Sequence, residues 1–253
     1  MIDLFSLKSK NALVTGSRTG LGAAMAVALA QAGANVVVHG SKTKGIAEVC
    51  EAVRAAGSRA VEAVADVSDA KACVELVELT VKELGSIDIL INNAGIIRRA
   101  PAAEYSEKDW ADVIEINLTA VFRFCQLAGR HMLAQGSGKI INVASLLAFQ
   151  GGITVPAYAA AKGGVAQITK SLANEWASKG INVNAIAPGY MATDNTAALR
   201  ADANRSRQIL ERIPAGRWGT PRDLAGVAVF LASHASDYIH GTVLTVDGGW
   251  MAR

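Results

Sequence analysis

The chain has 253 residues, a length that fits one large α/β domain. Hydrophobic residues make up 51% of it and aromatic residues only 5%, a balance that favours helices packed closely on a sheet over a β-sandwich. The formal net charge is +3 and the Lys and Arg residues are scattered, so the charge pattern gives no support for nucleic-acid binding.

Seven short apolar runs alternate with amphipathic helical segments from end to end, and the runs are too continuous for half-exposed strands. They cover residues 12–14, 35–38, 60–65, 87–91, 139–143, 182–186 and 243–246. The intervening segments are long enough for βαβ crossovers, which predicts one doubly wound, Rossmann-type parallel sheet of seven strands with helices on both faces. We therefore expect a single domain over 1–253, with its site residues directly after the runs, because such sheets bind ligands at the carboxyl ends of their strands.

A glycine-rich turn follows the first run. It reads Thr15-Gly-Ser-Arg-Thr-Gly-Leu-Gly22 and precedes a predicted helix over 23–31. Glycines there let the backbone approach a pyrophosphate, and the helix N-terminus presents unpaired N–H groups to the anion. Glycine also serves plain turns, but the position inside a βαβ unit favours a dinucleotide-binding loop. Its candidate contacts are Gly16, Arg18, Gly20, Leu21 and Gly22.

The residues after the second run bear on the identity of the nucleotide. An acidic residue at that place commonly binds the adenosine ribose hydroxyls, whereas this chain has His39, Ser41 and Lys42 and no carboxylate. An imidazole, a hydroxyl and an ammonium would tolerate a 2′-phosphate, and Arg18 would add charge. The pattern favours NADP and leaves NAD open.

Two further strand ends carry residues suited to a nucleotide. Asp66 and Val67 follow the third run, where the carboxylate would accept a hydrogen bond from the adenine amino group. Asn93, Ala94 and Gly95 follow the fourth, where small residues would let the cofactor lie against the backbone. Each could be ordinary strand-end punctuation, but their recurrence at successive strand ends favours contact with the cofactor.

Tyr158 and Lys162 lie one turn apart in a predicted helix over 157–177. A free tyrosine has a pKa of about 10, and a nearby ammonium lowers this pKa by favouring the phenolate, which predicts an acid/base pair for an alcohol–carbonyl couple. Ser145 follows the fifth run, where it would polarise the substrate oxygen or simply cap a helix. Asn117 is a mediocre helix former within a helical segment over 109–125, which suggests a packing or water-holding role.

Together these segments resemble the classical branch of the short-chain dehydrogenase/reductase family. The resemblance covers essentially the whole chain and rests on the glycine-rich turn, Asn92-Asn-Ala-Gly95, Asn117, Ser145, Tyr158-Ala-Ala-Ala-Lys162 and Pro188-Gly189. It implies an NAD(P)-dependent oxidoreductase acting on CH–OH donors, and a homotetramer.

The family resemblance also implies the role of each residue. Tyr158 would be the general acid/base, while Lys162 would lower its pKa and bind the nicotinamide ribose. Ser145 would stabilise the reacting oxygen, and Asn117 would hold a relay water. Thr193 would contact the nicotinamide carboxamide, and the same stretch adds Pro188, Gly189 and Met191 to the expected cofactor contacts.

A narrower resemblance concerns the substrate. Residues 92–99, 149–153, 187–196, 212–219 and 246–253 are similar to those of family members that act on keto-deoxy sugar acids released from uronate polymers, which implies carbohydrate catabolism by uronate degradation. That subfamily is usually associated with NAD, so both nucleotides stay open.

The residues add physical support for a sugar acid. A guanidinium matches a carboxylate, and Arg98, Arg99 and Arg217 are the candidates, with Gln150 for a sugar hydroxyl. Any single one of these arginines is equally well explained as a surface residue. The polar, Arg-rich segment at about 191–213 is interpreted as a substrate lid.

Two alternatives remain. An NADPH-dependent 3-oxoacyl-[acyl-carrier-protein] reductase of the same family would need an apolar channel, which the polar lid argues against. A catalytically silent cofactor-binding regulatory or scaffold protein should have lost Ser145, Tyr158 or Lys162, and all three are present.

The remaining features concern compartment and assembly. Cys50, Cys73 and Cys125 are far apart and fall in predicted helices, so we expect neither a metal site nor a disulfide framework. No apolar run is long enough for a membrane span, and residues 1–5 lack the pattern of a signal peptide. We expect a cytoplasmic protein with no membrane partner, and we interpret the tail around Trp250 as apolar surface for another subunit.

Overall fold

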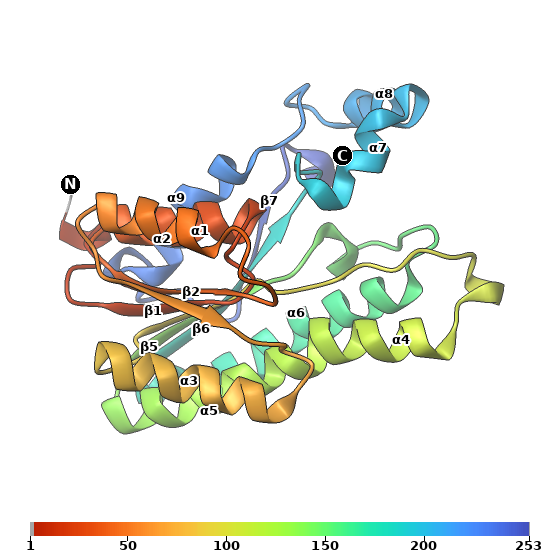
Figure 1. Cartoon of the computed structure of the whole chain (residues 1–253). Helices are drawn as coiled ribbons and strands as arrows, with labels where there is room; N and C mark the ends of the chain where they lie inside the picture. Colours follow the sequence, from red (N-terminus) through yellow and green to blue (C-terminus); the bar gives the residue numbers. More distant parts are fainter. Residues whose placement is uncertain (1–2, 253) are drawn as a thin grey trace.

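The computed structural model describes residues 3–252, and within them seven parallel strands form one sheet in the order β3-β2-β1-β4-β5-β6-β7 (Figure 1). This arrangement confirms the predicted doubly wound sheet. Strand order reverses between β1 and β4, so a ligand site is expected where their carboxyl ends meet. The strands are β1 (Asn11–Val14), β2 (Asn35–Gly40), β3 (Ala60–Val64), β4 (Ile89–Asn92), β5 (Gly138–Val143), β6 (Ile181–Pro188) and β7 (Val243–Val246).

Burial separates the central strands from the edge strands. Every residue of β1, β4 and β6 is buried. The expectation of burial on both faces is wrong for β3 and β7, where most residues are only partly covered and Val64 is 57% exposed. Each of these strands has a neighbour on one side only, so less of it is covered.

Helices cover both faces of the sheet (Figure 1). One layer packs on a core that includes Met25, Val36 and Leu231, and the other on a core that includes Leu90, Phe124 and Trp176. The first layer holds α1 (Gly20–Gln31), α2 (Ile46–Ala55) and α9 (Ala225–Ala232), and the second holds α3 (Ala70–Leu84), α4 (Glu107–Ile114), α5 (Ala120–Gln135) and α6 (Pro156–Trp176).

Two helices depart from the predicted boundaries. Helix α1 begins at Gly20 rather than at residue 23, which brings the last glycines of the turn into its first turn. The segment over 109–125 is helical but not uniform, because a five-residue π-helical stretch, Glu115–Thr119, joins α4 to α5. Such π turns are frequent at functional sites.

Above the carboxyl edge lie the short helices α7 (Ala197–Ala201) and α8 (Ala203–Arg212), close to the C-terminal end of the chain (Figure 1). Ile209 and Ile213 are buried against Leu146 and Trp250 in a third apolar cluster. Trp250 is therefore covered by its own chain and is not itself free apolar surface for another subunit.

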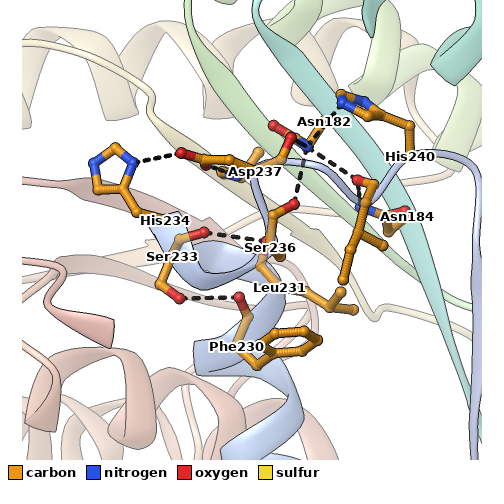
Figure 2. Close-up of polar contacts among 11 residues, drawn as sticks. Asn182, Asn184, Phe230, Leu231, Ser233, His234, Ser236, Asp237 and His240 are labelled. Carbon is orange, nitrogen blue, oxygen red and sulfur yellow. Dashed lines mark hydrogen bonds and ion pairs between the residues drawn. The ribbon is translucent and has the colours of Figure 1, made fainter. Parts of the chain in front are cut away.

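A polar cluster lies at the opposite edge of the sheet, at the start of β6 (Figure 2). The side-chain amide of Asn182, at the start of β6, lies within 3.0–3.2 Å of the carbonyl oxygens of Ser236, Asp237 and Ile239. The Asp237 carboxylate also pairs with Lys139 at 2.7 Å. These contacts attach the segment between α9 and β7 to the start of β6, at the edge of the sheet opposite the carboxyl ends of the strands.

Some expectations extend past the described residues. The predicted domain of 1–253 includes residues 1, 2 and 253, which lie outside them, and so does part of the segment judged for a signal peptide. Among residues 3–252 no helix has the length and apolar character needed to cross a membrane. Cys50, Cys73 and Cys125 are buried, unpaired thiols in helices, as expected.

Candidate functional site

The loops after β1 and β4 are bonded to each other at the switch point of the sheet. The Thr15 hydroxyl oxygen accepts hydrogen bonds from the backbone N–H groups of Asn93 and Ala94, each at 3.0 Å. The Asn93 side-chain amide donates to the carbonyl oxygens of Thr15 and Gly16 at 3.0 and 2.9 Å. Asn93 is thus a brace for the glycine-rich turn as well as a wall residue of the cavity beside it.

The glycine-rich turn has the geometry of an anion cradle. Gly16 has a φ of +63°, and a Cβ there would lie 2.9 Å from the Ala94 Cα. The cap residue Thr19 makes no side-chain hydrogen bond, so the first N–H groups of α1 are left for a ligand. The turn opens onto a cavity of about 560 Å³, a size within the range of ligand and cofactor sites. Of the predicted cofactor residues, those in its wall are Gly16, Arg18, Gly20, Leu21, His39, Ser41, Asp66, Val67, Asn93, Ala94, Gly95, Tyr158, Lys162 and Thr193.

Gly22, Lys42, Pro188, Gly189 and Met191 are not in that wall. Gly22 packs inside the loop, where a Cβ would lie 2.5 Å from the Gly16 carbonyl oxygen. Lys42 is exposed. Pro188 and Gly189 line the neighbouring cavity instead, and Met191 lines a smaller hollow of about 200 Å³.

His39 is a structural residue rather than a free phosphate ligand. Its ring is buried, and Nδ1 accepts a hydrogen bond from the Gly16 N–H at 3.0 Å. Nε2 must then carry the proton, and it donates to the Ala65 carbonyl oxygen at 3.1 Å. Burial lowers the pKa of His39, which keeps the imidazole neutral. Both ring nitrogens are already hydrogen-bonded, so the imidazole lines the cavity as a neutral group without a donor left over for a 2′-phosphate.

Arg18 covers the end of β2. A Cβ at Gly40 would lie 2.6 Å from the Arg18 Cδ, so the Arg18 side chain lies directly against the glycine and would have to shift for a larger residue. The guanidinium donates to the Lys44 carbonyl oxygen at 3.2 Å. Asp66, at the end of β3, accepts hydrogen bonds from the Ser68 N–H and hydroxyl, which lower the pKa of its carboxyl and keep it ionised.

Tyr158 lies where two cavities meet. It lines both the nucleotide cavity and a second cavity of about 780 Å³. Burial raises the pKa of Tyr158, while a hydrogen bond with Ser145 and the positive charge of Arg99 act in the opposite direction. Ser145 also accepts from the Leu147 N–H at 3.2 Å, which caps a short helical turn. A proton carrier and a polar partner therefore sit between the two cavities.

Lys162 is buried beneath Tyr158. Its Nζ lies 5.5 Å from the centre of the Tyr158 ring and donates to the Val143 carbonyl oxygen at 2.6 Å. Burial lowers the pKa of Lys162 to about 8. Arg99 is a cation whose charge acts to lower the pKa of Tyr158 against the larger effect of burial, while the Lys162 ammonium donates to the backbone.

Asn117 is fully buried in the π-helical stretch. Its side-chain amide donates to the carbonyl oxygens of Ile96 and Val113, both at 2.9 Å, and its oxygen accepts from the Ile96 N–H at 3.2 Å. The packing role is therefore clear: Asn117 holds the loop after β4 against α4. The displaced backbone of the π turn brings this side chain to that loop.

The second cavity has an unusual charge. Among the described residues, its charged side chains are Arg99, Arg205 and Arg212, with no carboxylate and no lysine. Gln150 lies in the wall, and its Oε1 accepts a hydrogen bond from the Trp250 indole N–H at 3.2 Å. Such a wall favours an anionic, hydrogen-bonding ligand.

The other two predicted arginines do not reach this cavity. Arg98 pairs with Asp109 at 3.4 Å. Arg217 makes a two-pronged contact with Asp223 at 2.7 and 2.8 Å, and its exposed guanidinium borders the small hollow next to Met191. Their selection from sequence is not supported, because neighbouring carboxylates occupy both guanidinium groups.

Arg205, Gln208 and Arg212 are cavity residues that sequence reasoning missed. They are spaced three and four apart along α8 and so share one face of the helix. If residues 203–212 of the predicted lid are assigned to a helix, this spacing predicts that the three polar side chains lie on one face and can line the same cavity.

Comparison with known proteins gives consistent matches along the whole chain. A family model described as enoyl-(acyl carrier protein) reductase matches residues 16–251. The 2-dehydro-3-deoxy-D-gluconate 5-dehydrogenase of Dickeya dadantii is 56% identical, covering 100% of both chains.

Solved structures agree with these matches. One from Agrobacterium tumefaciens, provisionally named a 2-deoxy-D-gluconate 3-dehydrogenase and holding NADP, is 55% identical with a TM-score of 0.93, covering 99% of this chain and 100% of that one. A gluconate 5-dehydrogenase from Burkholderia cenocepacia, solved with NADP and tartrate, is 41% identical with a TM-score of 0.95, covering 99% of this chain and 98% of that one.

Proposed function

Because the chain belongs to the short-chain dehydrogenase/reductase family, we propose that it interconverts a secondary alcohol and a ketone on a keto-deoxy sugar acid. The substrate is of the 2-dehydro-3-deoxy-D-gluconate or 2-deoxy-D-gluconate type, as in uronate degradation. The observation that carries this proposal is the cavity beside Tyr158, whose charged side chains among the described residues are all arginines. The relatives named for this chemistry match over the full chain.

The chemistry follows from the residues at the junction of the cavities. When bound, the nicotinamide nucleotide supplies or accepts the hydride. Tyr158 gives its phenolic proton to the carbonyl oxygen in reduction and takes it back in oxidation. Ser145 holds the same oxygen, and the charge of Arg99 favours the phenolate. Lys162 binds the nicotinamide ribose, and Asn117 positions the loop after β4 and holds a relay water.

The nucleotide is proposed to lie along the switch point, with its pyrophosphate on the turn from Gly16 to Gly22. NADP is supported by Arg18 and Ser41 in the cavity wall and by a glycine in place of a carboxylate at the end of β2. Both solved relatives hold NADP. NAD would fit the same cavity, because the described wall residues are held by contacts within the protein and do not need the 2′-phosphate of NADP to stay in place.

The proposal also covers the substrate lid, the oligomeric state and the cellular location. The segment at about 191–213 acts as the lid, since α8 packs over the substrate cavity through Ile209. A homotetramer is supported by Trp110 and Phe122, apolar side chains that are each 45% exposed. A cytoplasmic location suits three unpaired buried thiols.

The test is the oxidation of NADH or NADPH, followed by absorbance, with 2-dehydro-3-deoxy-D-gluconate and an acetoacetyl thioester offered separately. Turnover of the sugar acid alone supports the proposal. Turnover of the thioester alone would identify a 3-oxoacyl-[acyl-carrier-protein] reductase instead. No turnover of any carbonyl under saturating nucleotide would favour a silent cofactor-binding regulatory or scaffold protein.

A further inference from the structure

The guanidinium of Arg212 has no partner of opposite charge among the described residues, and Arg212 lines the substrate cavity. It stacks on the Trp250 indole, with Cζ 4.1 Å from the ring centre, and among residues 3–252 it makes no hydrogen bond or ion pair. This contact with the ring face holds the guanidinium in place, and its N–H donors remain for a ligand.

The end of helix α8 that carries Arg212 is held by apolar packing. Ile209 and Ile213, on either side of it in sequence, are 1% and 4% exposed. They pack with Leu146, the residue after Ser145, and with Trp250. The Trp250 indole N–H is bonded to Gln150, and Tyr190 lies 4.7 Å from the Trp250 ring. The arginine is therefore anchored to the same loop that presents Ser145.

The other two cavity arginines are differently engaged. The charge of Arg99 acts on Tyr158, which places it at the reacting end of the cavity. Arg205 donates to the Gln208 side-chain oxygen at 3.3 Å. The remaining described arginines of the lid bond elsewhere: Arg200 donates to the Thr193 carbonyl oxygen, and Arg207 pairs with Glu211 at 3.9 Å.

We propose that Arg212, held over the face of the Trp250 indole, is the receptor for the substrate carboxylate and sets the preference of the enzyme for acids over neutral sugars. A planar guanidinium with free donors matches a carboxylate with two parallel hydrogen bonds. Gln150, tied to the same indole, is placed to bind a neighbouring hydroxyl. This inference rests on the proposed function for the identity of the substrate but not for the existence of the carboxylate subsite.

The first experiment measures binding without turnover. Calorimetry compares D-gluconate with its neutral counterpart D-glucitol on the wild-type protein and on Arg212→Gln, Arg212→Lys and Arg207→Gln. Arg207 is the matched control, because it lies on the same helix outside the cavity wall. We expect Arg212→Gln to weaken gluconate binding about 10- to 100-fold, the range of a charge-assisted hydrogen-bonded pair. Arg212→Lys should recover part of this loss, and Arg207→Gln should match the wild type.

Kinetics then separates the two claims. With 2-dehydro-3-deoxy-D-gluconate, Arg212→Gln should raise KM by the same factor and leave kcat within about 3-fold, as expected when binding is lost equally from ground and transition states. Equal gluconate binding by the wild type and Arg212→Gln, or no preference of the wild type for gluconate over glucitol, would overturn the inference. Arg212-dependent gluconate binding without turnover of the keto-deoxy acid would overturn the proposed function and support the carboxylate subsite.

Discussion

The Nδ1 atom of His39 accepts a hydrogen bond from the backbone N–H of Gly16, and this bond ties the end of β2 to the turn proposed to cradle the nucleotide phosphates. The backbone repeats the link, since the Ser17 N–H donates to the His39 carbonyl oxygen at 2.7 Å. On the other side of the ring, the bond to Ala65 reaches the loop that carries Asp66. One neutral imidazole thus holds three strand-end loops in register.

Replacing His39 with alanine should weaken nucleotide binding. The Gly16 N–H and the Ala65 carbonyl lose their partner, so we expect the Kd of NADPH to rise about 10-fold, the equivalent of one hydrogen bond. Titration of the protein with NADPH by fluorescence measures this. An unchanged Kd would mean that the backbone links alone hold the turn.

The same residue predicts a pH dependence of stability. Burial lowers the pKa of His39, so the unfolded chain takes up this proton more readily than the folded one. The contribution of the neutral ring to the free energy of unfolding is present in full above about pH 6.5, the unperturbed pKa, and declines as the pH falls below it. Urea unfolding between pH 5 and 8 should show a smaller decline for His39→Ala than for the wild type.

Lys162 is expected to lower stability while serving catalysis. Burial lowers the pKa of Lys162 to about 8, so at pH 7 the side chain is still a charged ammonium, but its burial costs stability. Lys162→Met should reduce turnover about 100-fold or more and change the free energy of unfolding at pH 7 by no more than about 1 kcal/mol, because relief of this burial offsets the lost bond to Val143. From pH 8 to about 10.5 the wild type should gain stability relative to the variant. A large loss of stability at pH 7 would identify Lys162 as mainly structural.

Gly16→Ala should disrupt the turn for two independent reasons. A Cβ there would lie 2.9 Å from the Ala94 backbone, and the positive φ disfavours any side chain. We expect a loss of about 1–3 kcal/mol in the free energy of unfolding and no detectable NADPH binding. Gly226→Ala is the matched control, because an added Cβ there meets nothing within 4 Å. Alanine forms helices more readily than glycine, so this change in helix α9 should raise the free energy of unfolding by about 0.5–1 kcal/mol.

Arg18 is expected to decide between the two nucleotides. Its side chain lies over Gly40 in the wall where the adenosine ribose is proposed to bind. Arg18→Ala should reduce kcat/KM for NADPH about 10- to 100-fold and leave kcat/KM for NADH within about 3-fold, because only the 2′-phosphate needs the charge. An equal decrease for both nucleotides would show that Arg18 acts on the turn rather than on the phosphate.

The fold was predictable because each parallel strand is a short apolar run whose boundaries the flanking turns mark, and the central strands β1, β4 and β6 are buried throughout. The features that were predicted wrongly, the burial of the edge strands and the π-helical turn, depend on contacts with residues that are distant in sequence. Val64 is exposed because β3 is an edge strand, and the residues of a strand do not indicate its position in the strand order. The π turn at Asn117 depends on that side chain reaching Ile96.

The residues proposed for catalysis could be selected from the sequence as a set, since their types and order are specific, whereas the arginines of the second cavity could not. Arg98 and Arg217 follow suggestive segments, but Asp109 and Asp223 engage them. Arg212 looks like any exposed helical arginine until the fold stacks it on Trp250. Which guanidinium is left without a carboxylate is decided by tertiary contacts.

The most direct test of the proposed function is the oxidation of NADPH with 2-dehydro-3-deoxy-D-gluconate by the wild type and Tyr158→Phe, measured side by side. Phenylalanine keeps the packing between the two cavities and removes the proton, so turnover should fall about 100- to 10,000-fold while the Kd of NADPH stays within about 2-fold. Turnover by the wild type and its loss in the variant, with NADPH still bound, is the result we expect. Retained turnover in Tyr158→Phe, or none in the wild type, would contradict sugar-acid hydride transfer with Tyr158 as its acid and base.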